Sequence, residues 1–407
     1  MRRSNLTAAM FAGGLATFGE LYAVQAVLPA MSDALQLTES TASLAISVAT
    51  GALAVAVLPW AAVADRFGRA RTMTVALAVS AVCGLAIPLV PGMPMLLVLR
   101  AISGAALAAV PALAMAHVVE LAPRGRAVAA GGTYIAGTTV GGLSGRLLTG
   151  TVAGVVGGTD GWRWGLAATA VAVTALAVVF AVLLPHGEIS RAPRHSGRLR
   201  RAMSSRAAWV LYAQGFLLMG GFVTLYNLLP FRLLAAPYRV PASVVSLIFV
   251  TYLVGTAGSS MVGRLAGRFG RRAVVIAGGV GMALGTALTI TRPLWLVVVG
   301  LVVATFGFFV THAIAAGWVG VLLPDARSQA TALYSLCYYL GSSALGYLGA
   351  LIFTVAGWWG AAAMVTLSAV AAVTLATALA PAAPSSARSD GPAAQPGSAD
   401  PDGSVGR

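Results

Sequence analysis

Twelve runs of about 20 mostly apolar residues follow one another along the chain, and each is long enough to cross a bilayer as a helix. Charged residues make up only 9% of the 407 positions, against 58% that are hydrophobic, which leaves too little charge to cover a soluble protein of this length. The sequence therefore predicts an all-α membrane protein with twelve transmembrane helices. The runs lie at approximately 7–29, 42–64, 73–90, 94–119, 127–150, 163–184, 208–230, 243–263, 273–291, 294–319, 329–355 and 358–380.

Every basic residue is an arginine, and the arginines are divided unequally between the two sides of the predicted membrane. With the N-terminus in the cytoplasm, 20 arginines lie on the cytoplasmic side and 4 on the opposite side. The positive-inside rule then predicts a multi-pass protein of the plasma (inner) membrane with both termini in the cytoplasm. The net charge of +15 follows from this topology, so no nucleic-acid partner is expected. The two cysteines lie inside apolar runs and no Cys/His cluster exists, so neither a disulfide framework nor a metal site is expected.

The chain contains an internal repeat. Residues 64–69 (ADRFGR) recur as 266–271 (AGRFGR), 202 positions later, and the glycine-rich segment 134–145 has a counterpart at 338–349, 204 positions later. Each half has an even number of spans, so the sequence predicts two parallel-repeat six-helix bundles with a binding site between them at the bilayer midplane. We expect bundles at 1–184 and 208–380, a cytoplasmic basic linker at 185–207, and a disordered cytoplasmic tail at 381–407.

Three motifs resemble those of the major facilitator superfamily. Ala61-x-x-x-Asp65-Arg66-x-Gly68-Arg69-x-Arg71 is similar to the family's loop signature, and Leu96-x-x-x-Arg100-x-x-x-Gly104 to a motif of its proton-coupled members. Gly137-x-x-x-Gly141-Gly142-x-x-Gly145 resembles the antiporter motif, with Gly142 where the family has proline. Within the family, the chain is similar to the drug:proton antiporters and arabinose-efflux-permease-like bacterial inner-membrane transporters.

The resemblance implies a secondary active transporter that exports a small organic solute or drug by alternating access with proton coupling. An importer (symporter) of a small metabolite with the same fold is the alternative. The chain has no lysine, so it has no Walker A motif for ATP, and it has no cluster of catalytic side chains; an enzyme is not expected. We expect a monomer with a small-molecule substrate, protons and membrane lipid as partners, and no cofactor.

The loop signature predicts a latch that holds one half against the other on the cytoplasmic side. In it, Gly68 allows a tight turn, Asp65 accepts hydrogen bonds from a helix N-terminus, and Arg66 and Arg69 pair with Glu120. The alternative is a loop that only sets topology.

Ionisable groups inside a membrane are rare and costly, so each one is a candidate for function. Glu20 is the only carboxylate well inside a span, and Arg100 lies within the fourth span. We expect Glu20 to carry the coupling proton and Arg100 to tune it. A static ion pair between the two is the alternative. Arg146, near the outer end of the fifth span, is expected to extend its side chain towards the surface, and His117 is expected to be structural.

Polar and aromatic residues on the candidate cavity helices form the predicted substrate site, which suits a lipophilic or weakly polar solute. They are Tyr22, Gln25, Gln214, Tyr226, Asn227, Phe308 and His312. Small residues at four-residue spacing predict close helix packing at an interface between the halves, or alternatively plain packing without a gating role. These are Gly137, Gly141, Gly142, Gly145, Gly341 and Gly346.

Overall fold

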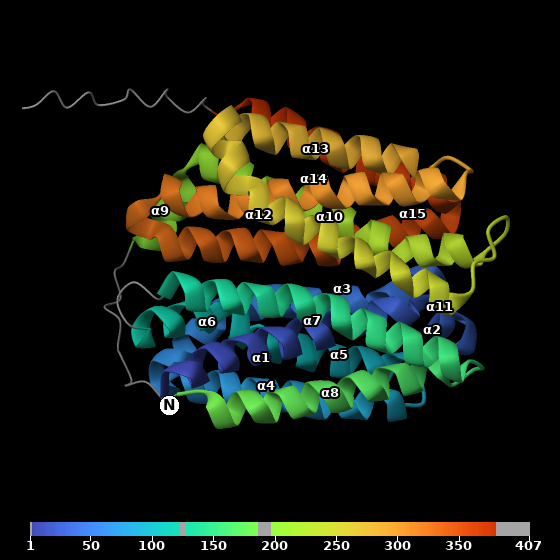
Figure 1. The fold of residues 1–407 in the computed structure, drawn as a ribbon, viewed down its shortest axis with the longest axis horizontal. Coiled ribbons are helices and arrows are strands. Elements are labelled where there is room, and N and C mark those ends of the chain that lie inside the picture. The colour runs from blue at the N-terminus through green and yellow to red at the C-terminus, as the bar shows by residue number, and fades with distance from the viewer. Residues whose placement is uncertain (1, 123–126, 186–196, 380–407) are drawn as a thin grey trace, which may run out of the picture.

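The computed structural model describes residues 2–122, 127–185 and 197–379, and these residues form an all-helical protein without strands (Figure 1). The predicted tail and the first part of the predicted linker lie outside the described residues. The N-terminal half contains α1 (Arg2–Ala23), η1 (Val24–Val27), α2 (Leu28–Ala34), α3 (Glu39–Phe67), α4 (Arg69–Ala86), η2 (Ile87–Leu89), α5 (Met93–Leu107), α6 (Ala109–Leu121), α7 (Ala127–Val156) and α8 (Gly161–Leu183). The C-terminal half contains α9 (Arg198–Ser204), α10 (Arg206–Leu234), α11 (Ala242–Val245), η3 (Ser246–Thr251), α12 (Tyr252–Phe269), α13 (Arg271–Leu288), α14 (Leu294–Leu322), η4 (Pro324–Ala326) and α15 (Arg327–Thr377).

The described helices make twelve membrane spans. Ten helical stretches are long and apolar enough to cross a bilayer. One of them, Pro324–Thr377, holds two spans, because the backbone leaves helical geometry at Gly357 (φ 62°, ψ −160°). The 30-residue helix α7 is the remaining span. The predicted fold class is therefore confirmed.

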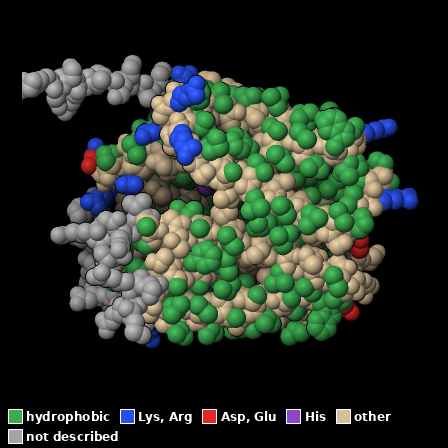
Figure 2. All heavy atoms as spheres, viewed as in Figure 1, with side chains coloured by type: hydrophobic (Ala, Val, Ile, Leu, Met, Phe, Trp, Pro, Cys, Tyr) green, Lys and Arg blue, Asp and Glu red, His purple; other side chains and the backbone are tan. Residues whose placement is uncertain are grey.

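The two halves form separate layers whose helices run nearly side by side, with α1–α8 below and α9–α15 above in Figure 1. One end of the molecule carries the N-terminus and α9, and the other carries α2 and α11; we name these the α9 end and the α11 end. Most arginine side chains visible in Figure 2 gather at the α9 end, while apolar side chains cover the flank between the ends. The α9 end is thus the side that the arginine count assigns to the cytoplasm.

The two loop signatures have nearly the same backbone. Gly68 (φ 84°, ψ 144°) joins α3 to α4, and Gly270 (φ 81°, ψ 150°) joins α12 to α13. Positive φ favours glycine at both positions, and each glycine N–H bonds the carbonyl four residues earlier, Ala64 and Ala266. The sequence repeat is therefore also a structural repeat.

The second part of the predicted linker is folded onto the C-terminal half. Helix α9 lies at its end, where the Tyr212 hydroxyl donates to the Ala202 carbonyl over 3.2 Å and Arg201 lies 3.3 Å from Asp325. Ala202 is buried. The predicted linker is therefore wrong for residues 198–207, which belong to the C-terminal half.

The glycine stripes pack helices within each half. A Cβ atom at Gly137, Gly141 or Gly145 would collide with the backbone of Phe11, Leu15 or Gly19 on α1, and one at Gly341 would collide with Phe216 on α10. The expectation that the stripes face the opposite half is therefore wrong for these positions. The four-residue spacing predicts a close approach, but it does not say which neighbouring helix makes it.

The two remaining glycines, Gly142 and Gly346, lie near the junction between the halves. Gly142 offers its carbonyl oxygen to Arg146. A Cβ at Gly346 would lie 3.2 Å from Val223 and 3.8 Å from the Ser47 hydroxyl of the opposite half.

Replacing Gly141 with alanine should lower the stability of the protein, because the added methyl group would push α7 away from α1. Overpacking of this kind costs about 1–3 kcal/mol. Gly132 on the same helix has open space where its Cβ would lie, so Gly132→Ala is the matched control. Thermal unfolding of the purified variants in detergent should show a lower midpoint for Gly141→Ala alone; equal midpoints would contradict the close packing of α1 and α7.

Candidate functional site

The two halves meet at the α11 end and separate towards the α9 end. Three hydrogen bonds that join described residues of opposite halves lie towards the α11 end: Gln25 to Asn227 (2.5 Å), Ser343 to Ser47 (2.7 Å) and Thr354 to Glu39 (3.2 Å). Figure 2 shows a hollow between the layers near the α9 end. The structure is thus closed at one end and open at the other.

The closed end is built around Arg146 of α7, whose side chain is only 2% exposed. Its Nε donates to the Gln25 side-chain oxygen over 2.6 Å, and its Nη1 donates to the Gly142 carbonyl over 2.5 Å. Gln25 in turn donates from Nε2 to Asn227 of α10 over 2.5 Å. One polar chain therefore runs from the N-terminal half into the C-terminal half.

Three aromatic rings surround the Arg146 guanidinium. Its central carbon lies 4.5 Å from the ring centroid of Tyr22, 4.7 Å from that of Tyr252 and 5.3 Å from that of Phe249. A cation near aromatic faces gains up to about 2 kcal/mol when it is removed from water. Tyr252 and Phe249 belong to the C-terminal half, so the cation attracts the opposite half directly.

The charge of Arg146 has no acidic partner among the described residues. None of their carboxylates comes within ion-pair distance of it. Two hydrogen-bond donors of the same site, Asn227 Nδ2 and the Tyr22 hydroxyl, have no hydrogen-bond partner. Both residues are buried. Unsatisfied buried donors are uncommon in native proteins, and two of them around one cation can serve an acceptor that is not part of the chain.

A line of aromatic ring contacts runs from two partly exposed side chains to Arg146. His312 and Tyr338 at its outer end are partly exposed, and the rings beyond them are buried. The centroid distances along the line are 4.6 Å for Tyr338–His312, 5.7 Å for His312–Phe308, 4.0 Å for Phe308–Phe222 and 5.4 Å for Phe222–Tyr252. We name these five side chains the aromatic ladder; its two outer rings are accessible and its inner rings continue to Arg146.

The structure brings together five of the seven predicted substrate residues. Tyr22, Gln25 and Asn227 belong to the Arg146 junction, and Phe308 and His312 to the ladder. The other two are used within the C-terminal half. Gln214 donates to the Ala372 carbonyl over 2.7 Å, and the Tyr226 hydroxyl lies between Thr251 (2.5 Å) and Thr305 (2.7 Å).

Glu20 and Arg100 are both buried but do not form an ion pair. Glu20 accepts a hydrogen bond from Ser80 over 2.6 Å, and its other oxygen has no partner. That oxygen would lie 3.3 Å from a Cβ at Gly84 of α4, so the carboxyl lies within its own bundle. Arg100 donates to the carbonyls of Ala45 (2.8 Å) and Leu21 (2.5 Å) instead. A buried carboxylate without an ion pair is costly when ionised.

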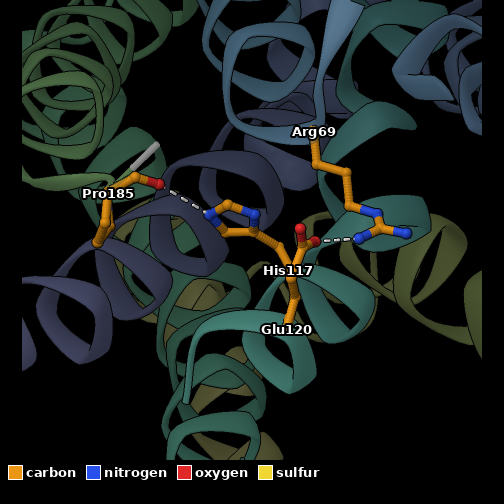
Figure 3. A network of polar contacts seen from close by, with 4 residues as sticks. All are labelled: Arg69, His117, Glu120 and Pro185. Carbon is orange, nitrogen blue, oxygen red and sulfur yellow. Dashed lines mark hydrogen bonds and ion pairs between the residues drawn. The ribbon is translucent and has the colours of Figure 1, made fainter. Parts of the chain in front are cut away.

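The predicted latch residues lie at the α9 end. Arg69 forms an ion pair with Glu120, and His117, one turn earlier on α6, bonds the carbonyl of Pro185 over 3.1 Å (Figure 3). Both contacts tie helices of the N-terminal half together, so neither joins the two halves. Asp65 makes no hydrogen bond or ion pair with any described residue. The role of Asp65, Arg66, Gly68, Arg69 and Glu120 as a latch stays a prediction.

Arg146 is the site residue that sequence reasoning missed. The sequence predicts a side chain that reaches the surface, but Arg146 lies ten residues from the outer end of α7 and its guanidinium lies between rings of the two halves. Two features of the sequence could have indicated this. Apart from Arg100, it is the only arginine deep inside a span, and Gln25 and Asn227 are separated by 202 residues, which is the offset of the repeat. Positions related by the repeat are expected to meet near the axis between the halves.

Comparison with known proteins agrees with this architecture. The sequence profile described as Major Facilitator Superfamily matches residues 10–234 and again residues 211–401. The chain belongs to the major facilitator superfamily. It is 35% identical over 382 residues to the inner membrane transport protein YnfM of Escherichia coli (strain K12), covering 92% of this chain and 90% of that protein. It is 32% identical to the uncharacterized MFS-type transporter YybF of Bacillus subtilis (strain 168), covering 91% and 92%.

Solved structures share the fold at low sequence identity. A bacterial homolog of the human lysosomal transporter Spinster, in an inward-facing and unoccupied conformation, matches with a TM-score of 0.77 at 16% identity. The match covers 92% of this chain and 95% of that one. The chain is therefore a multi-pass transporter of this family.

A disulfide placed across the closed end should form readily and stop transport. A Cβ at Gly154 of α7 would lie 3.2 Å from the Ser243 Cβ of α11, close to the spacing in disulfides. In a background without Cys83 and Cys337, Gly154→Cys/Ser243→Cys should cross-link under mild oxidation, and reductant should restore transport. The control pair Gly132→Cys/Gly263→Cys joins the same pair of spans near the α9 end, where both positions face open space. Equal cross-linking of the two pairs would contradict a structure closed only at the α11 end.

Proposed function

We propose that this protein exports a small organic solute by alternating access, driven by protons. One observation supports this more than any other: two repeated halves meet at one end, and a hollow opens between them at the other. Such an arrangement is one state of a transporter whose halves rock about a central site.

The direction of transport rests on the distribution of arginines. The arginine-rich α9 end is assigned to the cytoplasm by the positive-inside rule, and the hollow opens at that end. An exporter loads its substrate from this side. The similarity to an inner membrane transport protein supports a plasma (inner) membrane location with both termini in the cytoplasm. We propose that the protein acts as a monomer.

The latch would act in the other state of the cycle. Asp65 and Arg66 lie at the α9 end, where the halves are apart, and Asp65 has no partner among the described residues. When the halves rock and the α9 end closes, these side chains come within reach of the C-terminal half. Gly267 takes the position of Asp65 in the second repeat, so the latch is proposed for the first repeat alone.

Proton coupling is assigned to Glu20. It is a buried carboxyl with one hydrogen-bond donor, Ser80, and no ion pair. A carboxyl in such surroundings can gain and lose a proton as its access to water changes during the cycle. Arg100 holds the backbone at Leu21 and is proposed to fix the position of Glu20 rather than to neutralise it.

Glu20→Gln should abolish proton-driven transport, because glutamine keeps the size and the hydrogen bond to Ser80 but cannot titrate. Uptake of a labelled solute panel into inside-out vesicles with an imposed pH gradient measures this, and counterflow in the same vesicles reports exchange without a gradient. Asp33→Asn is the matched control, since Asp33 is an exposed acid at the α11 end. We expect counterflow to persist in Glu20→Gln. Undiminished proton-driven accumulation in this variant would contradict the assignment of proton coupling to Glu20. Transport of the solute in the opposite direction would show that the protein is an importer.

A further inference from the structure

We infer that the substrate is a small organic monoanion, whose acidic group binds at Arg146 and whose flat apolar body lies on the aromatic ladder. This inference rests on the proposed function and names its substrate class. It differs from the expectation drawn from the sequence, which favoured a lipophilic or weakly polar solute.

The charge inside the membrane favours an anion. Among the described residues deep in the spans, Arg100 and Arg146 carry positive charge and Glu20 is the one carboxyl. Arg100 is bonded to backbone carbonyls of its own half, Ala45 and Leu21. Arg146 is thus left as an unpaired cation at the point where the two halves meet, where one added negative charge would balance it.

The hydrogen-bonding groups at the junction favour a ligand that carries hydrogen-bond acceptors. Asn227 Nδ2 and the Tyr22 hydroxyl are buried and have no hydrogen-bond partner, and the Arg146 guanidinium has no acidic partner among the described residues. Carboxylate oxygens accept from all three kinds of group, and charge-assisted bonds to a guanidinium are among the stronger hydrogen bonds in proteins. A cationic ligand would place like charge beside Arg146 and would leave Asn227 Nδ2 and the Tyr22 hydroxyl unsatisfied.

The aromatic ladder favours a ligand with a flat apolar group. Its rings lead from the partly exposed Tyr338 and His312 to Tyr252, whose centroid is 4.7 Å from the Arg146 guanidinium carbon. Stacked rings favour a flat aromatic or unsaturated solute, since offset and edge contacts between rings contribute about 0.5–1.5 kcal/mol each. A ligand that extends from the ladder to Arg146 would satisfy both features together.

Binding of matched ligands to the purified full-length chain tests this inference without any pH gradient. We would titrate phenylacetate, 3-phenylpropionate and indole-3-acetate, together with their neutral amides and amine counterparts, and follow the thermal shift. At least one acid should bind about tenfold or more tightly than its amide, as expected for hydrogen bonds to a charged group, and the amines should not bind. If no acid binds more tightly than its amide, the inference is wrong, while the proposal of proton-driven export stands on the vesicle assay.

Two variants test whether Arg146 causes the tighter binding of the acid than of its amide. Arg146→Gln should remove the difference between acid and amide. Asn227→Asp keeps the oxygen that accepts from Gln25 but replaces the free donor with a carboxylate oxygen, so it should also remove acid binding while keeping Arg146 in place. Arg163→Gln, which removes an arginine bonded to the Pro88 and Val90 carbonyls at the α11 end, should keep the preference. If Asn227→Asp or a folded Arg146→Gln still binds the acid tenfold more tightly than the amide, the acidic group does not bind at Arg146.

Discussion

The buried guanidinium of Arg146 is the charge on which the closed end of the molecule depends. Removing a cation from water costs several kcal/mol unless nearby groups replace its hydration. Here Gln25 and Gly142 supply oxygen atoms, and Tyr22, Tyr252 and Phe249 supply aromatic faces. Two of the three rings come from the C-terminal half. Separation of the halves at the α11 end would therefore expose the cation, so closure of this end and burial of Arg146 are one physical event.

The position of Arg146 depends in turn on how helices pack within its own half. Gly145, its neighbour in sequence, lies against the backbone of Gly19, which brings α7 close enough to α1 for Arg146 to reach Gln25. The repeat does not duplicate this cation, because Ala350 stands 204 residues later. If an anion binds at Arg146 as proposed, it competes with the aromatic faces for the guanidinium, and loading of substrate would then weaken the contact that keeps the α11 end closed.

The sequence predicts the spans, the repeat and the loop turns well, because each depends on local features: the length of apolar runs, an offset near 202, and a glycine that adopts positive φ. It does not predict which side of a span faces the cavity. A helix that is apolar all round has no polar face to fix its rotation. Glu20 and Gln214 therefore resemble cavity residues in the sequence, yet they lie inside their own bundles, whereas Arg146 lies at the junction. The glycine stripes fail in the same way, since spacing predicts close packing but not the partner.

Distances between spin labels across the two halves test the central role of Arg146 most directly. Exposed positions Thr159 and Ala235 report the α11 end, and Phe67 and Ser328 report the α9 end. Double electron–electron resonance on the full chain in lipid nanodiscs should give one narrow, short distance at the α11 end. In Arg146→Gln we expect this distribution to broaden towards longer distances while the α9-end distance shortens. An α11-end distribution in Arg146→Gln that superimposes on that of the unsubstituted protein would contradict the account.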